Sequence, residues 1–283
     1  MSSRLEKNMP IQKEIDDEEK RRKWKKFISI FLKIFIPISL ILIISFVSLR
    51  YIGTSGLVVK EYAIYSDKVN NDLDGLKIVH FGDINFNDVT NINKVKKVVN
   101  TIVKINPDVV IFTGDLISED YVVNNDTKEE LIDLFYTIDP KIGKYFVLGE
   151  KDKEVSKTIL SSSGFSLLEK NEIIYLGSEK FNLVIDDKFD SSLFTIGVIH
   201  EINKNKDFLL NKDMVISGHN LNGSVRFPFF GRLFSDLKYI ESHYKVNNTD
   251  LFITSGVGNN KYNFRLFNHP SINFFRIKKV LGN

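Results

Sequence analysis

Five short apolar runs, each ending in an acidic residue or a histidine, constrain the fold of this chain more than any other feature. They read LKIVHFGD, DVVIFTGD, KYFVLGEKD, LFTIGVIH and DMVISGH, and they end at Asp83, Asp115, Asp152, His200 and His219. Short and nearly continuous apolar runs are typical of strands that are buried on both faces. A single Gly-Asp ending is commonly only a turn, but five such endings together indicate a shared site.

Two amphipathic segments separate the first three runs. The first, NKVKKVVNTIVKIN, predicts a helix whose apolar face carries Val95, Val98, Val99, Ile102 and Val103. The second, DTKEELIDLFYTI, predicts a helix with Asp126 as its N-cap and Glu129 completing a capping box. A strand-rich part follows from NEIIYLG and FNLVID onward. This order of elements indicates an α/β fold, in which ligand chemistry gathers at the carboxyl ends of the strands.

The residue types at these strand ends are those of metal ligands. Carboxylate oxygens and imidazole nitrogens suit divalent ions such as manganese, iron and zinc. The chain has no cysteine, which excludes disulfides, thiolate metal sites and cysteine nucleophiles. Residues 50–283 contain neither a Pro-, Gly- or Ser-rich linker nor a repeat, so we expect one domain there.

A long apolar run precedes this domain. Residues 27–49 read FISIFLKIFIPISLILIISFVSL, with a single charge at Lys33. About 20 apolar residues cross the hydrocarbon core of a bilayer, and a lysine near one end can reach the interface. A signal peptide has a shorter apolar run and is followed by an A-x-A-like cleavage site, which is missing here. We therefore expect one transmembrane helix over residues 27–49.

Charge around this run predicts its orientation. KRRKWKK, before the run, holds six positive charges, whereas Arg50 and Lys60 are the basic residues nearby on the other side. The positive-inside bias puts residues 1–26, a basic tail that we expect to be disordered, in the cytoplasm. We therefore expect a single-pass protein of the cell membrane, with its domain at 50–283 outside the cytoplasm.

The chain beyond the basic tail, residues 27–283, carries no net charge. Residues 1–26 hold nine of the 39 basic residues and six of the 36 acidic ones, which leaves 30 of each sign for the rest. A neutral body lacks the basic surface that nucleic-acid binding requires, so we expect no nucleic-acid partner. The partner that the sequence indicates is the lipid bilayer.

The ordered set of strand-end motifs resembles the calcineurin-like metallophosphoesterases, and most closely a membrane-associated bacterial branch. Members of that branch carry D-x-H, G-D, G-N-H-D, a lone H and G-H-x-H-G-G-Q. The flanking text also fits, from GLKIVHFGD and NPDVVIFTGDLI to LFITSGVGNNKYNFRLFNHPSI. The resemblance implies a four-layer α-β-β-α sandwich with a pair of metal ions that share one aspartate and activate water towards phosphorus.

Several motif positions differ from the family pattern. Asp83 and Asp115 match the two aspartates, but Asn85 stands where the first motif has histidine. GEKD replaces G-N-H-D, so Glu150 takes the place of a ligand asparagine and Lys151 that of the catalytic histidine. His200 and His219 match the family, whereas Leu221 replaces the final histidine. Arg226 fits a position that the resemblance links to substrate binding.

These differences fall mainly on one of the two implied metal positions. By resemblance, one position would use Asp115, Glu150, His200 and His219, which is a sufficient ligand set for one manganese, iron or zinc ion. The other would use Asp83, Asn85 and Asp115 with a leucine that cannot coordinate, so we expect it to be empty.

Two functions remain open on the sequence. A one-metal phosphoesterase of low activity would act on a phosphomonoester, a phosphodiester or a lipid diphosphate, with Lys151 as a point charge. A pseudo-phosphoesterase would keep the fold as a surface binding or structural module, with Lys151 paired to the acids in place of metal. The pair Glu150 and Lys151 discriminates between them: Lys151 pointing into the site favours the pseudo-phosphoesterase, whereas Glu150 pointing in with Lys151 pointing out favours the one-metal enzyme.

Overall fold

The computed structural model divides the chain into two compact units, residues 1–49 and 50–283. It describes residues 2–47, 56–202, 207–220, 226–227, 231–232, 239, 241–258, 265 and 268–280. The first unit is a single helix, α1 (Ser2–Val47). Within α1, Asp17–Val47 includes an apolar stretch that is long enough to cross a membrane.

Helix α1 extends almost to the N-terminus, over residues 1–26 that the sequence predicts to be a disordered tail. Ion pairs one turn apart support it, between Glu18 and Arg22 at 3.7 Å and between Glu19 and Lys23 at 2.8 Å. Such pairs on a Lys/Glu-rich surface stabilise a helix without any tertiary contact.

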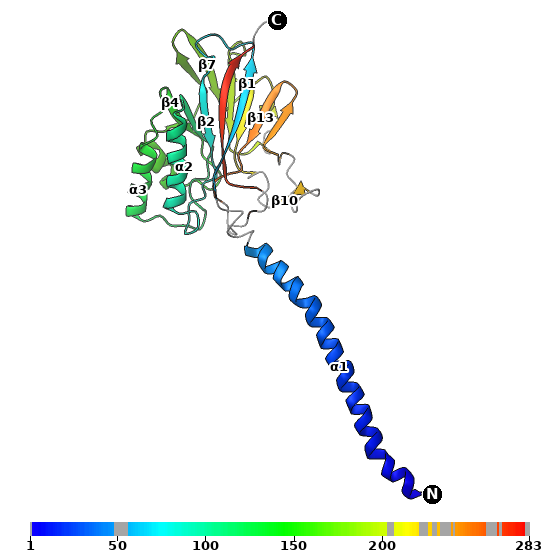
Figure 1. Cartoon of the computed structure of the whole chain (residues 1–283). Helices are drawn as coiled ribbons and strands as arrows, with labels where there is room; N and C mark the ends of the chain where they lie inside the picture. The colour runs from blue at the N-terminus through cyan, green and yellow to red at the C-terminus, as the bar shows by residue number, and fades with distance from the viewer. Residues whose placement is uncertain are drawn as a thin grey trace. The chain divides into compact units, whose positions relative to one another are not determined.

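The described part of the second unit contains two six-stranded sheets and three α-helices, which can be followed in Figure 1. The first sheet has the order β1-β14-β2-β3-β4-β5, formed by Val58–Ser66, Ser271–Lys279, Lys77–Phe81, Val109–Phe112, Gly143–Phe146 and Ser166–Leu167. The second has the order β12-β13-β9-β8-β7-β6, formed by His243–Val246, Thr249–Ile253, Met214–Ser217, Thr195–Ile199, Glu179–Val184 and Glu172–Leu176. A short hairpin pairs β10 (Arg226–Phe227) with β11 (Gly231–Arg232).

The strands on which the site depends run parallel within each sheet. β2, β3 and β4 are parallel neighbours in the first sheet, as are β8 and β9 in the second. Four of the five apolar runs form buried strands, as predicted, whereas β4 is half-buried up to Phe146. Because parallel strands end at the same edge, the residues that follow them come together.

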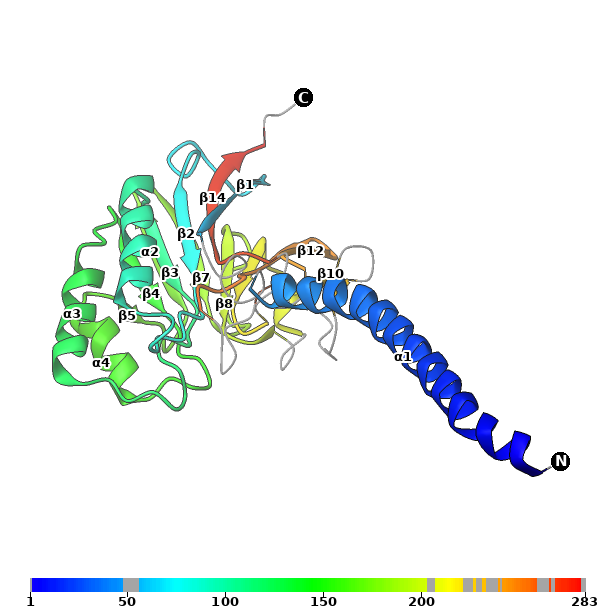
Figure 2. The ribbon, with the colours of Figure 1, turned by 60° about the horizontal axis from the view of Figure 1, so that its bottom comes forward.

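Three helices cover the outer face of the first sheet (Figure 2). They are α2 (Ile92–Ile105), α3 (Asn125–Tyr136) and α4 (Glu154–Ser162). Val95, Val98, Val99 and Ile102 of α2 pack against the strand residues Val79 and Val110 in one core cluster. The N-cap of α3 is Asn124, whose side chain accepts from the Thr127 amide, so the predicted capping box at Asp126 and Glu129 is wrong.

A second core lies between the sheets, and a third covers the outside of the second sheet. The middle core joins Ile78, Ile111 and Phe275 to Ile196 and Ile216. On the outer face of the second sheet, in the described part of the chain, the 3-10 helix η3 (Asp207–Leu209) and Tyr239 pack instead of an α-helix. The molecule is thus the predicted α/β sandwich, with a thin outer layer on this side.

Candidate metal centre

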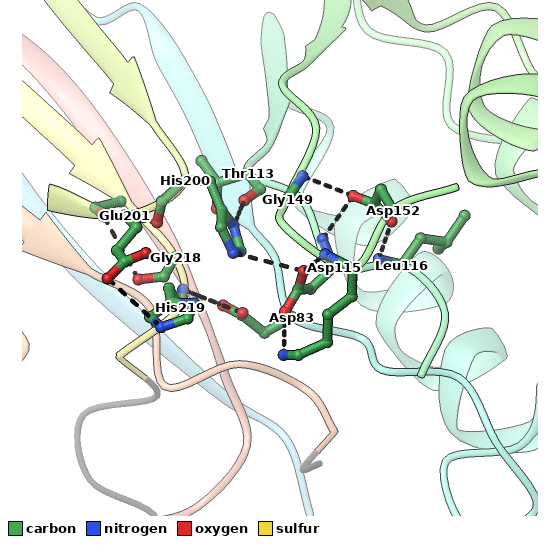
Figure 3. Close-up of polar contacts among 12 residues, drawn as sticks. Asp83, Thr113, Asp115, Leu116, Gly149, Asp152, His200, Glu201, Gly218 and His219 are labelled. Carbon is green, nitrogen blue, oxygen red and sulfur yellow. Dashed lines mark hydrogen bonds and ion pairs between the residues drawn. The ribbon is translucent and has the colours of Figure 1, made fainter. Parts of the chain in front are cut away.

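The carboxyl ends of β2, β3, β8 and β9 bring Asp83, Asp115, His200 and His219 into one cluster (Figure 3). Ligand atoms of Asp115, His200 and His219 all lie within 4.8 Å of one another. The two imidazole rings meet edge to face with their centroids 5.3 Å apart.

Three of these residues occupy left-handed backbone conformations. The φ angles are 50° at Asp83, 58° at Asp115 and 62° at His219. Asp and His are both enriched among the non-glycine residues found in this region, and the short side chain of Asp can bond locally there. Each strand thereby turns sharply at its end and directs the functional side chain across the sheet edge.

The loop of Asp115 is held by Asp152, the last residue of the GEKD stretch. The Asp152 carboxylate accepts from the amides of Gly149 and Asp115, both at 2.8 Å, and of Leu116 at 2.9 Å (Figure 3). Charge-assisted bonds of this kind are the stronger ones in proteins. They fix the loop after β4 against the loop after β3.

His200 is oriented by the backbone of β3. Its Nδ1 donates to the Thr113 carbonyl at 2.6 Å, which leaves Nε2 as the unprotonated nitrogen. Nε2 faces Asp115 Oδ1 at 3.5 Å but has no hydrogen-bond partner among the described residues. A buried side chain with a free lone pair is the state that a metal ligand requires.

His219 links the Asp83 carboxylate to a residue that the motif analysis missed. The backbone amide of His219 donates to both Asp83 oxygens at 3.1 Å. Its Nε2 lies 3.8 Å from Glu201 Oε1. Glu201 directly follows His200 in the sequence. Its place next to a strand-end histidine could have identified it as a candidate site residue.

Burial dominates the electrostatics of the cluster. It raises the pKa of Asp83 to about 7, and the negative charge of Asp115 acts in the same direction. Burial also lowers the pKa of His219, so the imidazole is neutral and able to coordinate a metal.

Lys151 points into the cluster. Its Nζ lies 2.6 Å from Asp115 Oδ2, and its backbone amide donates to Asp115 Oδ1 at 3.3 Å. The lysine side chain is 16% exposed and that of Asp115 is 1% exposed. Glu150 is exposed instead and groups with Glu201 and His219, their ligand atoms within 4.8 Å of one another.

The residues present fit one divalent ion better than two. Asp115, His200 and His219 supply three donors, and the free Nε2 of His200 supports this use. At the neighbouring position, Asn85 is fully buried and neither of its amide atoms has a partner in the described chain. Lys151 already holds the second oxygen of Asp115. Leu221 and the side chain of Arg226 lie outside the described residues.

A two-sheet α/β sandwich with aspartates and histidines at the ends of parallel strands defines a metallophosphoesterase, and comparison with known proteins agrees. The family model described as calcineurin-like phosphoesterase matches residues 76–271. The chain therefore belongs to the calcineurin-like phosphoesterase family.

Individual relatives are distant. The uncharacterized metallophosphoesterase YkuE of Bacillus subtilis (strain 168) is 26% identical over 262 residues, which cover 82% of this chain and 89% of that protein. A protein of unknown function from Aquifex aeolicus, AQ665, is 19% identical, covering 55% of this chain and 82% of its own, with a TM-score of 0.32. TT1561 of Thermus thermophilus is 9% identical, covering 65% of this chain and 90% of its own, with a TM-score of 0.40.

Proposed function

We propose that this chain is a membrane-anchored metallophosphoesterase-domain protein that holds at most one divalent ion and has very low phosphoesterase activity. The observation that carries the proposal is the ion pair between Lys151 and Asp115, at 2.6 Å. In the family pattern, that aspartate is shared by two metal ions. Here an ammonium group already neutralises it.

The ion pair opposes a second dication on energetic grounds. Asp115 is almost fully buried, and an unpaired buried charge costs several kcal/mol, so the lysine stabilises it. A metal ion that displaced Lys151 would have to offset the loss of this pair. It would also leave the ammonium close to a dication, which is repulsive in a site of low dielectric constant.

The surroundings of Lys151 also disfavour phosphate. A cavity of about 390 Å³ beside it is lined by Asp88, Glu119 and Asp120 together with Asn87 and Tyr121. These three carboxylates repel an approaching phosphoryl group. One bound ion would supply polarisation of a phosphoryl oxygen and activation of water, but the described residues that line this cavity offer, besides Lys151, no basic side chain to hold the anion.

The second candidate is a pseudo-phosphoesterase that binds a partner without catalysis. The inward direction of Lys151 and the exposure of Glu150 favour it, because Glu150 then contributes less to the cluster of Asp115, His200 and His219. The two candidates differ in whether the wild-type chain binds a metal ion at all.

Anchoring by α1 is part of the proposal. Its apolar stretch and the positive charges before it support a single span with the N-terminus in the cytoplasm and the domain outside. Such a location would bring the site near phosphorylated lipid or small extracytoplasmic phosphoesters, and these are the substrate classes that we would test.

Metal stoichiometry of the full-length protein in detergent tests the proposal. We expect at most one manganese, iron or zinc ion per chain and almost no hydrolysis of an aryl phosphate or a bis-aryl phosphodiester with added manganese. Replacing Asn85→His, Lys151→His and Leu221→His together should raise the stoichiometry towards two. Two ions per wild-type chain with rapid hydrolysis would contradict the proposal.

A single substitution separates the two candidates. Lys151→Met nearly keeps the length of the side chain and removes the ammonium group, so the affinity of the protein for manganese should rise at least tenfold. Lys153→Met is the matched control, because Lys153 Nζ bonds to the Glu119 carbonyl away from the cluster. Metal bound by wild type supports the one-metal candidate, whereas metal bound only by Lys151→Met supports the pseudo-phosphoesterase.

A further inference from the structure

His80 is a buried polar residue that the metal-site motifs do not include. It lies on β2 between Asn273 of β14 and Ile111 of β3, and its side chain is fully buried. A histidine in the core between two sheets costs free energy unless both ring nitrogens are bonded. Its hydrogen bonds therefore indicate what it does.

Both ring nitrogens of His80 have partners. The Asn273 amide nitrogen lies 3.2 Å from Nδ1, and Nε2 lies 2.9 Å from Thr113 Oγ1. Because an amide NH₂ only donates, Nδ1 is the acceptor and Nε2 carries the proton that it donates to the threonine hydroxyl. Burial lowers the pKa of His80 to about 3, which agrees with this neutral ring.

Thr113 connects His80 to the metal cluster. Its carbonyl accepts the Nδ1 proton of His200 at 2.6 Å, while its hydroxyl accepts a hydrogen bond from His80. Two glycines make room for it: a Cβ at Gly82 would collide with its hydroxyl, and one at Gly218 would lie 3.0 Å from its carbonyl oxygen. The residue is thus enclosed where the ends of the two sheets meet.

We propose that His80 is a positioning residue, which acts through Thr113 to hold His200 in one tautomer with Nε2 facing Asp115. The bond from His80 fixes the Thr113 side chain and with it the peptide that carries the acceptor carbonyl. Outer partners of this kind set the ring orientation of metal-binding histidines. The inference concerns the site of the proposed function, but its test needs neither metal nor activity.

The test is the tautomer of His200 in the full-length protein in detergent, labelled with ¹⁵N-histidine and without metal. Long-range ¹H–¹⁵N spectra distinguish the two neutral tautomers, and His200→Gln assigns the signals. In wild type we expect a single Nδ1–H pattern for His200. Thr113→Val removes the hydroxyl while nearly keeping the shape of the side chain. His80→Phe removes the ring that donates a hydrogen bond to this hydroxyl. Both variants should turn the single pattern into a mixture or broaden it.

Thr113→Ser is the rescue control, because it keeps the hydroxyl and should retain the wild-type pattern. A single unchanged tautomer in folded Thr113→Val and His80→Phe would reduce His80 to a packing residue and overturn the inference. If Thr113→Val does not fold, His80→Phe and Thr113→Ser still decide. Loss of the pattern in Thr113→Ser, or its retention in His80→Phe, would overturn the inference equally.

Discussion

A lysine cannot replace a histidine beside a metal ion, and much of this protein's chemistry follows from that. An imidazole offers a neutral lone pair, whereas an ammonium is a compact positive charge with donors only. In the proposed function, the pairing of Lys151 with Asp115 makes one half of an ion pair of a residue that the family pattern shares between two metal ions. Asn85 is fully buried, and neither of its amide atoms has a hydrogen-bond partner among the described residues.

Histidine burial makes the stability of the domain depend on pH. The pKa of His80 is about 3 in the folded chain, below the usual 6.5. In the unfolded chain the ring gains a proton below pH 6.5, but the folded chain resists it until about pH 3. The contribution of His80 to the free energy of unfolding is therefore complete above pH 6.5 and is lost as the pH falls from there towards 3.

We expect the free energy of unfolding to fall by about 2 kcal/mol between about pH 7 and about pH 5 on account of His80, since one pKa unit corresponds to about 1.4 kcal/mol. Urea unfolding at the two pH values measures this. Asp83, whose pKa is raised to about 7, acts in the opposite direction over this range, so His80→Gln is the reference, and the stability of wild type relative to it should fall by this amount. An equal change in wild type and His80→Gln would show that His80 does not contribute to the dependence.

At the scale of elements, the loops after β3 and β4 lie unusually close together. A Cβ at Gly149 would be 2.6 Å from the Asp115 amide nitrogen and 2.9 Å from Cε1 of His200, and closer still to Asp115 Oδ1. A Cβ at Gly114 would meet Gly149 in the same way. Glycine is needed here because two backbones and a ligand side chain share the space.

Gly149→Ala should therefore destabilise the domain by about 1–3 kcal/mol, because neither backbone can move without breaking the bonds to Asp152. Gly143→Ala is the matched control at the start of β4, where the new methyl group meets only the movable ring of Tyr145. Chemical denaturation should show a clear loss for the first variant and a small change for the second. Similar losses for both would refute the close approach as the cause.

The sequence predicted elements whose signal is local and missed those set by distant contacts. Apolar runs identified β2, β3, β8 and β9, and the 3.6-residue period identified α2, because burial on one face or both leaves a pattern in the chain. The cap of α3 was misplaced because Asn124 and Asp126 are both good N-caps and only the side-chain geometry chooses between them.

The site was harder to predict in detail. Strand ends bring Asp83, Asp115, His200 and His219 to one edge, and the sequence pattern already suggested this neighbourhood. The direction of Lys151 could not be predicted, since a long flexible side chain follows the nearest buried charge, which is a tertiary contact. The contact of Glu201 with His219 and the hydrogen bond between His80 and Thr113 are also tertiary contacts, so they could not be predicted from the sequence either.

For the whole molecule, the proposed topology has a direct test. Protease added to intact cells should remove a tag at the C-terminus and leave a tag at the N-terminus intact, because positive charges before the apolar stretch of α1 retain that end in the cytoplasm. A cytoplasmic marker protein that stays uncut is the control. Protection of the C-terminal tag until the cells are lysed would reverse the orientation.

The position of β14 has a consequence for when the domain can fold. This strand comes last among the elements, yet it lies between β1 and β2, pairing with β1 along Val58–Ser66 and with β2 along Lys77–His80. Its residues Ile272, Phe275 and Ile277 fill both faces of the first sheet. A growing chain can form α2, β3 and β4 early, but β1 has no neighbour until Ser271–Lys279 has been made. Folding of this domain therefore cannot be completed before Ser271–Lys279 has been made.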